Sequence, residues 1–107
     1  MKHILFICSR NRLRSPTAET VFCEREGWSV RSAGLASDAD VALSVEDVEW
    51  AEVIFVMESV HRRKLSEKFG ASLKNQRVVC LGIPDNYDFM DPELIRLLKQ
   101  KMPPLVG

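Results

Sequence analysis

The chain brings a thiol, a guanidinium and a hydroxyl close together near its start, at Cys8, Arg14 and Ser15. Cys8 closes the apolar run Ile4–Ile7, and Pro16 opens a helical pattern, which predicts a strand, a short loop and a helix. Such a loop presents unpaired backbone N–H groups and the positive end of a helix dipole, and both favour anions and thiolates. A guanidinium also matches two phosphate oxygens at once. We therefore interpret the stretch from Cys8 to Ser15 as a phosphate-binding loop with a nucleophilic thiol at its floor.

The alternative for Cys8 is structural: a small buried cysteine fills the core and Arg14 lies on the surface. However, arginine at the sixth place after a cysteine, followed by serine, is an uncommon coincidence in a chain with three cysteines. The loop also follows a buried strand and precedes a helix with proline in its first turn. This context favours the phosphate-binding interpretation.

These residues resemble a known family, the low-molecular-weight protein tyrosine phosphatases. The similarity spans most of the chain. It is carried by the segments Ile4–Cys8, Asn11, Arg14–Pro16, Ala18–Glu19, Val21–Phe22, Arg31–Gly34 and, weakly, Ile54–Ser59.

The resemblance implies a role for each residue of the loop. Cys8 is then the nucleophile, and Arg14 binds the phosphoryl group. Ser15 hydrogen-bonds the thiolate, and Asn11 holds the loop in a left-handed turn, which asparagine tolerates better than most residues. The residues expected to bind phosphate or substrate are Ser9, Arg10, Asn11, Arg12, Leu13, Arg14, Ser15 and Tyr87.

Two loop residues depart from the family pattern. Arg10 stands where the family usually has glycine, so either the loop is reshaped or this position needs no special backbone angles. Leu13 replaces a frequent second cysteine, which removes the disulfide that some relatives form with the nucleophile. The stretch between Gly34 and Ser44 is also too short for the extra helix that the family places there. The chain is therefore predicted to be a shortened member.

Ester hydrolysis needs a general acid that protonates the leaving oxygen. The segment Ile83–Tyr87 resembles the family's Asp-Pro-Tyr segment, with the order of proline and aspartate inverted. The resemblance assigns Asp85 as the acid and Tyr87 as a side wall of the cleft. The alternative for Asp85 is an aspartate that forms a turn, since the sequence Pro-Asp-Asn is common in turns. Asp91, directly before Pro92, is predicted to cap a helix instead.

Four short apolar runs, rich in valine and isoleucine, have the composition of strands buried on both faces. They are His3–Ile7, Trp28–Ser32, Val53–Met57 and Arg77–Gly82. Helical patterns cover Ser15–Glu26, a short stretch opened by a Ser44 and Asp47 capping box, the stretch from Met57 to Gly70, and a last helix from Asp91 and Pro92.

This alternation predicts an α/β fold, a four-stranded parallel sheet with helices on both faces and right-handed crossovers. The family resemblance implies the strand order 2-1-3-4, a three-layer, flavodoxin-like arrangement. Ligands of such sheets bind beyond the carboxyl ends of the strands, which is where Cys8 lies.

The composition predicts one domain, residues 1–107, and 15 basic residues balance 15 acidic ones. We therefore expect no binding to nucleic acid or to a membrane surface.

The first apolar run is too short for a signal peptide, and three cysteines without secretory context indicate reduced thiols. We expect a monomeric cytoplasmic protein that acts on a phosphorylated protein or a small phosphomonoester. Because no cluster has metal-ligand spacing and no nucleotide-binding glycine loop occurs, we expect no metal ion and no cofactor.

Several other reactive residues are interpreted as structural. His3 and His61 have no Cys or His partner nearby in the sequence. Each is therefore interpreted as a histidine that is hydrogen-bonded within the protein or lies on the surface. Cys23 falls on a predicted helix and Cys80 on a predicted strand, and both are interpreted as side chains that fill the core. The run Arg62–Lys64 is expected to be a solvated helix face.

Three functions stay open from the sequence. The favoured one is a cysteine-dependent phosphatase that hydrolyses a phosphomonoester, with protein phosphotyrosine as the family default, through a cysteinyl-phosphate intermediate. The second is thiol redox chemistry such as arsenate reduction, which the same fold hosts and which needs a resolving cysteine able to reach Cys8. The third is a phosphate-binding module that keeps the loop without hydrolysing its ligand.

Overall fold

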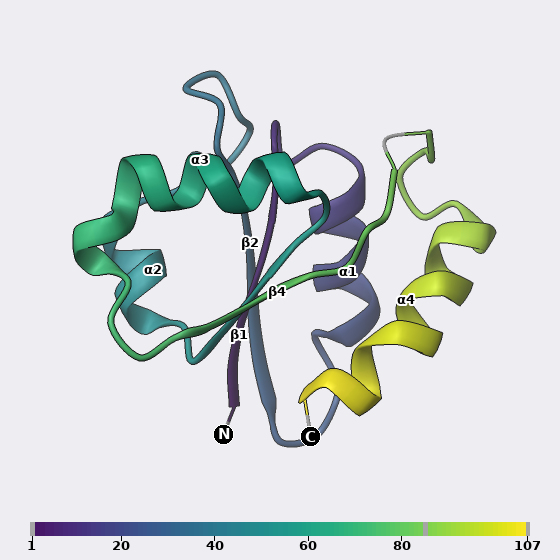
Figure 1. The fold of residues 1–107 in the computed structure, drawn as a ribbon. Coiled ribbons are helices and arrows are strands. Elements are labelled where there is room, and N and C mark those ends of the chain that lie inside the picture. Colours follow the sequence, from purple (N-terminus) through teal and green to yellow (C-terminus); the bar gives the residue numbers. More distant parts are fainter. Residues whose placement is uncertain (1, 85, 107) are drawn as a thin grey trace.

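A four-stranded parallel sheet forms the centre of the molecule (Figure 1). The computed structural model describes residues 2–84 and 86–106. The strands are β1 (Lys2–Cys8), β2 (Trp28–Gly34), β3 (Val53–Val56) and β4 (Arg77–Cys80), in the order β2-β1-β3-β4. The predicted parallel sheet and its strand order are confirmed.

Helices cover both faces of this sheet. They are α1 (Arg14–Phe22), α2 (Val45–Trp50), α3 (Ser59–Phe69) and α4 (Pro92–Val106), with a short 3-10 helix, η1 (Gly70–Ser72), directly after α3. Figure 1 shows α1 and α4 on one side of the sheet and α2 and α3 on the other. In the ranges that the structure describes, no helix is long and apolar enough to cross a membrane.

The apolar run of β1 is continuous because both of its faces are buried. Ile4 and Phe6 pack in a cluster with side chains of α1 and α4, and Leu5 and Ile7 pack in a second cluster with side chains of α2 and α3. All four side chains are fully buried. A strand between two helical layers needs apolar residues on both sides, which explains the absence of polar alternation.

The ends of several elements differ from the predictions. β2 continues to Gly34, two residues beyond Ser32, because Gly34 still pairs with β1. α1 ends at Phe22 rather than at Glu26, and a turn with a backbone bond from Arg25 N to the Phe22 carbonyl oxygen (3.1 Å) follows it. β3 ends one residue earlier than predicted and β4 two residues earlier. Local periodicity does not fix these ends, because they depend on strand pairing.

The segment 35–43 folds back onto the loop that follows β1. Its backbone N–H groups donate to carbonyl oxygens of the loop, from Leu35 to Cys8 (3.0 Å), from Ala36 to Ser9 (2.8 Å) and from Asp40 to Arg10 (3.0 Å). Every residue of this segment is described and none is helical, which agrees with the expectation that no extra helix fits here. The segment instead fixes the backbone of the predicted phosphate-binding loop.

Candidate active site

The thiol of Cys8 lies at the carboxyl end of β1 and is 3% exposed. Its sulfur accepts a hydrogen bond from the backbone N–H of Asn11 (3.3 Å) and lies 2.9 Å from the hydroxyl of Ser15. The Ser15 Oγ accepts a bond from Asn11 Nδ2 at 2.9 Å. The hydroxyl keeps its own proton available, and it can donate this proton to the sulfur when Cys8 is a thiolate. The surroundings of the sulfur can thus supply two hydrogen bonds to a thiolate nucleophile.

The backbone of the loop turns at Asn11, which has φ 56 and is buried. This is the left-handed region, which asparagine enters more readily than other residues with a side chain. Among the non-glycine residues that the structure describes, only Asn11 and Met90 have positive φ. Arg10 therefore has ordinary backbone angles, and this position needs no glycine.

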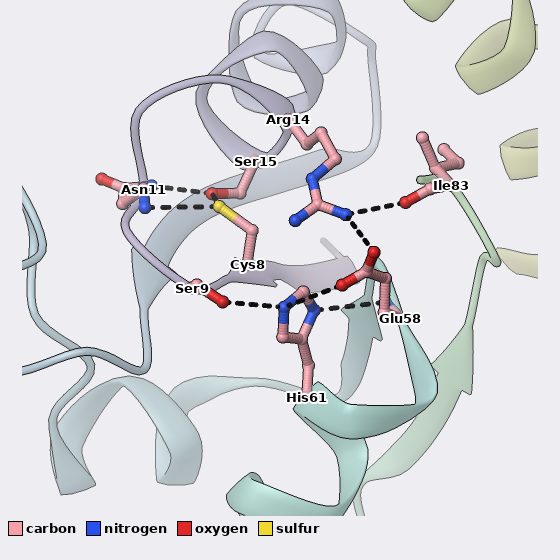
Figure 2. A network of polar contacts seen from close by, with 8 residues as sticks. All are labelled: Cys8, Ser9, Asn11, Arg14, Ser15, Glu58, His61 and Ile83. Carbon is pink, nitrogen blue, oxygen red and sulfur yellow. Dashed lines mark hydrogen bonds and ion pairs between the residues drawn. The ribbon is translucent and has the colours of Figure 1, made fainter. Parts of the chain in front are cut away.

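Arg14 lies in the first turn of α1 with its side chain only 4% exposed. Its Nη1 donates to the carbonyl oxygen of Ile83 (2.7 Å) and lies 3.3 Å from Oε1 of Glu58. Figure 2 shows the guanidinium between Cys8 and Ile83. A buried cation is tolerated when such partners replace its hydration. The carbonyl and the carboxylate, which follow β4 and β3, therefore hold the guanidinium at the site.

Glu58 and His61, at the start of α3, complete this network and were not predicted as site residues (Figure 2). The backbone N–H of Glu58 donates to Nδ1 of His61 (3.1 Å), and Nε2 lies 3.1 Å from Ser9 Oγ. Because Nδ1 accepts, the ring proton belongs on Nε2, which donates to Ser9. The fully buried His61 thus braces the loop from α3. The available signal was the position of Glu58, just beyond a buried strand at the same sheet edge as Cys8.

The two other arginines of the loop point to the segment 35–43. Arg10 Nη1 lies 3.6 Å from Asp38 Oδ2, and Arg12 Nε donates to Asp40 Oδ1 at 3.2 Å. The four side chains are 50% to 62% exposed. These pairs lie at the rim of the site, in contrast to the buried Arg14.

A pocket of about 460 Å³ opens above the sulfur. It is lined by Cys8, Ser9, Arg10, Arg12, Leu13 and Arg14. Asn11 and Ser15 are buried and support it from below. Tyr87 is half-buried and packs against the core cluster on the α1 and α4 side, and it is not among the lining residues. Asp85, the predicted acid, lies outside the described residues.

A larger hollow, of about 650 Å³, lies at the opposite edge of the sheet beside Lys2 and Arg77, the first residues of β1 and β4. Size alone does not identify a site. The smaller pocket holds a buried thiol and a buried guanidinium, and the larger one holds exposed polar side chains, so we assign the chemistry to the smaller pocket.

The other two cysteines lie away from Cys8. Cys80 pairs with Val56 of β3, which pairs with Ile7 of β1. Two strand spacings of about 4.8 Å place Cys80 roughly 10 Å from β1, beyond the Cα separation of about 7 Å that a disulfide spans. Cys80 also packs on the α2 and α3 face, whereas Cys8 packs on the opposite face. Cys23 follows the last residue of α1, and nine helical residues at about 1.5 Å each separate it from the loop.

No family model and no curated protein matches the sequence. Solved structures do match. A YwlE mutant from Bacillus subtilis is 25% identical over 100% of both chains, with a TM-score of 0.75. A YwlE arginine phosphatase with a phosphorylated active-site serine is 26% identical over 92% of this chain and 91% of its own, with a TM-score of 0.71. A low-molecular-weight phosphotyrosine phosphatase from Vibrio cholerae O395 is 19% identical over 99% of this chain and 95% of its own, with a TM-score of 0.78.

The chain has the fold of the low-molecular-weight protein tyrosine phosphatases. The resemblance seen in the sequence is confirmed over most of the chain. The 26% identical structure is described as an arginine phosphatase, which supports a cysteine-dependent phosphatase at the level of the family.

Proposed function

We propose that the protein hydrolyses a phosphomonoester through a cysteinyl-phosphate intermediate, with Cys8 as the nucleophile. One observation carries this proposal: the buried sulfur of Cys8 accepts the Asn11 N–H and lies 2.9 Å from the Ser15 hydroxyl, at the floor of a pocket that Arg14 lines. This combination gives a nucleophile and a positioned phosphate donor in one place.

In the first step the thiolate attacks phosphorus in line with the leaving oxygen. The S–P bond forms, the P–O bond to the leaving group breaks, and the acid donates its proton to the leaving oxygen. Charge on the equatorial oxygens is spread through a loose transition state. The guanidinium of Arg14 and the loop N–H groups stabilise this charge, and Ile83 and Glu58 fix the guanidinium before the substrate arrives.

In the second step a water molecule attacks the cysteinyl-phosphate. The acid, now a carboxylate, accepts a proton from the water, the S–P bond breaks and Cys8 leaves as a thiolate. The Ser15 hydroxyl that lies 2.9 Å from the sulfur stabilises this leaving thiolate. The neighbour with a phosphorylated active-site serine supports a covalent intermediate in this fold.

The substrate that we propose is a phosphorylated protein side chain, and phosphotyrosine is the first candidate. Phosphoarginine is the second, because a matching structure of this fold is described as an arginine phosphatase. Phosphoarginine is a phosphoramidate, so with this substrate the P–N bond breaks and the acid donates its proton to the leaving nitrogen. The redox alternative lacks support, because neither Cys23 nor Cys80 reaches Cys8. A measurement of turnover distinguishes the third hypothesis, a phosphate-binding module, from the phosphatase.

The function is tested with purified wild type and Cys8→Ser on phosphotyrosine and phosphoarginine peptides. We expect phosphate release by wild type, none by Cys8→Ser, and protection of Cys8 from alkylation by phosphate or vanadate. Cys23 and Cys80 should show no such protection. Phosphate binding without turnover would favour the phosphate-binding module, and activity of Cys8→Ser would remove Cys8 from the mechanism.

For the acid we propose Asp85, and Asp91 provides the matched control. Asp91 Oδ1 accepts the backbone N–H of Glu93 at 2.9 Å, just before α4 begins at Pro92, so Asp91 caps this helix. Asp85→Asn should slow hydrolysis of an alkyl phosphate by about a hundredfold or more and spare nitrophenyl phosphate, whose leaving group needs no proton.

The same two substrates are measured with Asp91→Asn, which should leave turnover nearly unchanged. Asp91→Ala should lower the free energy of unfolding by about 1 kcal/mol through loss of the cap. If the loss that depends on the leaving group occurs in Asp91→Asn and not in Asp85→Asn, the acid is Asp91.

A further inference from the structure

The lining of the active-site pocket is strongly cationic. Arg10, Arg12 and Arg14 alternate along the loop, and all three line the pocket. Arg14 is buried beside the sulfur, whereas the other two arginines are more exposed, at the rim. Leu13 is the one aliphatic residue of the lining, and no aromatic residue of the described chain is among the lining residues.

The rim arginines are held by weak ion pairs. Arg10 pairs with Asp38 at 3.6 Å, and Arg12 pairs with Asp40 at 3.2 Å. All four side chains are half exposed or more, and exposed ion pairs contribute little free energy because water solvates both charges. An anionic group on a bound substrate therefore competes with Asp38 and Asp40 at little cost.

The backbone that carries the rim arginines is nevertheless fixed. The backbone of the segment 35–43 is hydrogen-bonded to the loop, including the bond from Asp40 N to the Arg10 carbonyl oxygen at 3.0 Å. Both arginines therefore start from a defined place at the mouth of the pocket. Each guanidinium can exchange its exposed aspartate for an anion of the substrate.

We propose that Arg10 and Arg12 form a second anion subsite at the rim, so that the preferred substrate is a phosphomonoester with a second anionic group beside the phosphate. In a phosphoprotein this group is an aspartate or glutamate flanking the phosphorylated residue. The inference rests on the proposed phosphatase function and adds the substrate class. Arg14 and the loop N–H groups hold the reacting phosphate, and the rim arginines hold its anionic neighbour.

The test compares three phosphotyrosine peptides of one length, with glutamate, alanine or lysine on both sides of the phosphorylated residue. At low salt, kcat/KM should be about five to ten times higher for the glutamate peptide than for the alanine peptide, the effect expected of two exposed ion pairs. The lysine peptide should be the poorest substrate. The preference should shrink as salt screens the charges.

Variants assign this preference to the rim. Arg10→Gln with Arg12→Gln should remove most of the ratio between the glutamate and alanine peptides. Asp38→Asn with Asp40→Asn should raise the ratio, because the aspartates no longer compete. Arg63→Gln is the matched control, since Arg63 is an exposed α3 arginine that does not line the pocket. It should leave the ratio unchanged.

Equal kcat/KM for the three peptides, with hydrolysis that still needs Cys8, would overturn this inference and leave the proposed function intact. The inference is also wrong if the ratio survives in the double arginine variant, or if Arg63→Gln lowers it equally. Absence of hydrolysis of every peptide would overturn this inference for phosphotyrosine, and if nitrophenyl phosphate and phosphoarginine peptides are also left intact, it would overturn the proposed function.

Discussion

Arg14 joins three parts of the molecule, because it starts α1, donates to the carbonyl oxygen of Ile83 and pairs with Glu58. We predict that Arg14→Lys lowers kcat/KM. The corresponding loss of transition-state stabilisation is about 2 to 4 kcal/mol, by analogy with the loss of an oxyanion donor. A lysine offers one point charge and cannot keep its carbonyl partner while binding two phosphate oxygens in one plane.

The measurement is steady-state kinetics on an aryl phosphate, with thermal unfolding to confirm that the variant folds. Arg12→Ala is the comparison and should cost less, because Arg12 is half exposed at the rim. Equal activity of Arg14→Lys and wild type would remove Arg14 from the mechanism.

At the scale of residues, the sequence predicts what is local and misses what is distant. Cys8, Asn11 and Ser15 lie within one loop, so their spacing alone suggests that they meet. Ser9 and His61 are 52 residues apart, and their bond exists only because β3 pairs beside β1. His61 was interpreted as structural, and no pattern in the sequence connected it to the loop.

At the scale of elements, the segment between β4 and α4 is tied to α1 at two points. Arg14 holds the Ile83 carbonyl near its start, and Thr17 Oγ1 accepts the backbone N–H of Met90 (2.9 Å) near its end. The Thr17 hydroxyl donates to the Leu13 carbonyl oxygen at 2.6 Å. Met90 has φ 61, a backbone conformation that a methionine adopts only when its surroundings enforce it.

We predict that Thr17→Val lowers the free energy of unfolding by about 1 to 3 kcal/mol, because the valine leaves the Met90 N–H without its acceptor. The segment also carries Asp85, so hydrolysis of an alkyl phosphate should fall more than hydrolysis of nitrophenyl phosphate. Thr17→Ser keeps the hydroxyl and should retain most of the wild-type behaviour. If valine and serine at this position have the same effect, the bond to Met90 does not position the segment.

A second prediction at this scale concerns the segment 35–43, where Gly34 approaches the loop. A Cβ at Gly34 would lie 2.6 Å from the Cβ of Ala39 and 2.7 Å from the Ser9 carbonyl oxygen. Gly34→Ala should therefore displace the segment or the loop, cost about 1 to 3 kcal/mol of stability and weaken vanadate binding.

Gly70→Ala is the matched control for this substitution. A Cβ at Gly70 meets no atom within 4 Å, and its φ of −54 suits alanine, so the variant should be neutral or slightly stabilising. Unfolding by denaturant and vanadate titration of both variants provide the comparison. Tight vanadate binding and full stability of Gly34→Ala would show that the segment does not support the loop.

At the scale of the whole molecule, alternating strand and helix patterns were sufficient for the layered sheet, because each strand buries both faces. The strand order came from the family resemblance and is confirmed. The path of the segment 35–43 could not be predicted, since its bonds run to the loop after β1 and leave no periodic pattern. The side wall expected of Tyr87 likewise depended on how the segment before α4 packs, which local chemistry does not determine.

The distribution of the three cysteines over the fold leads to the last prediction. Cys8 faces the α1 and α4 layer, Cys80 faces the other layer two strands away, and Cys23 lies beyond the far end of α1. Leu13 also leaves the loop without a second thiol. Hydrogen peroxide should therefore oxidise the Cys8 thiolate to a sulfenic acid that has no thiol partner in its own chain.

We expect brief peroxide treatment to inactivate the enzyme, with a gain of one oxygen atom in the intact mass and recovery on addition of a thiol. Longer treatment should become irreversible as the sulfur passes to the sulfinic acid, because no disulfide intercepts the sulfenic acid. Cys23→Ser and Cys80→Ser should inactivate and recover like wild type, since neither thiol reaches Cys8. An oxidised monomer that has lost two hydrogen atoms and gained no oxygen contains an internal disulfide or a sulfenamide at Cys8, and only the disulfide depends on a second cysteine. Finding it, with loss in one serine variant, would show that the fold opens far enough for redox chemistry at Cys8.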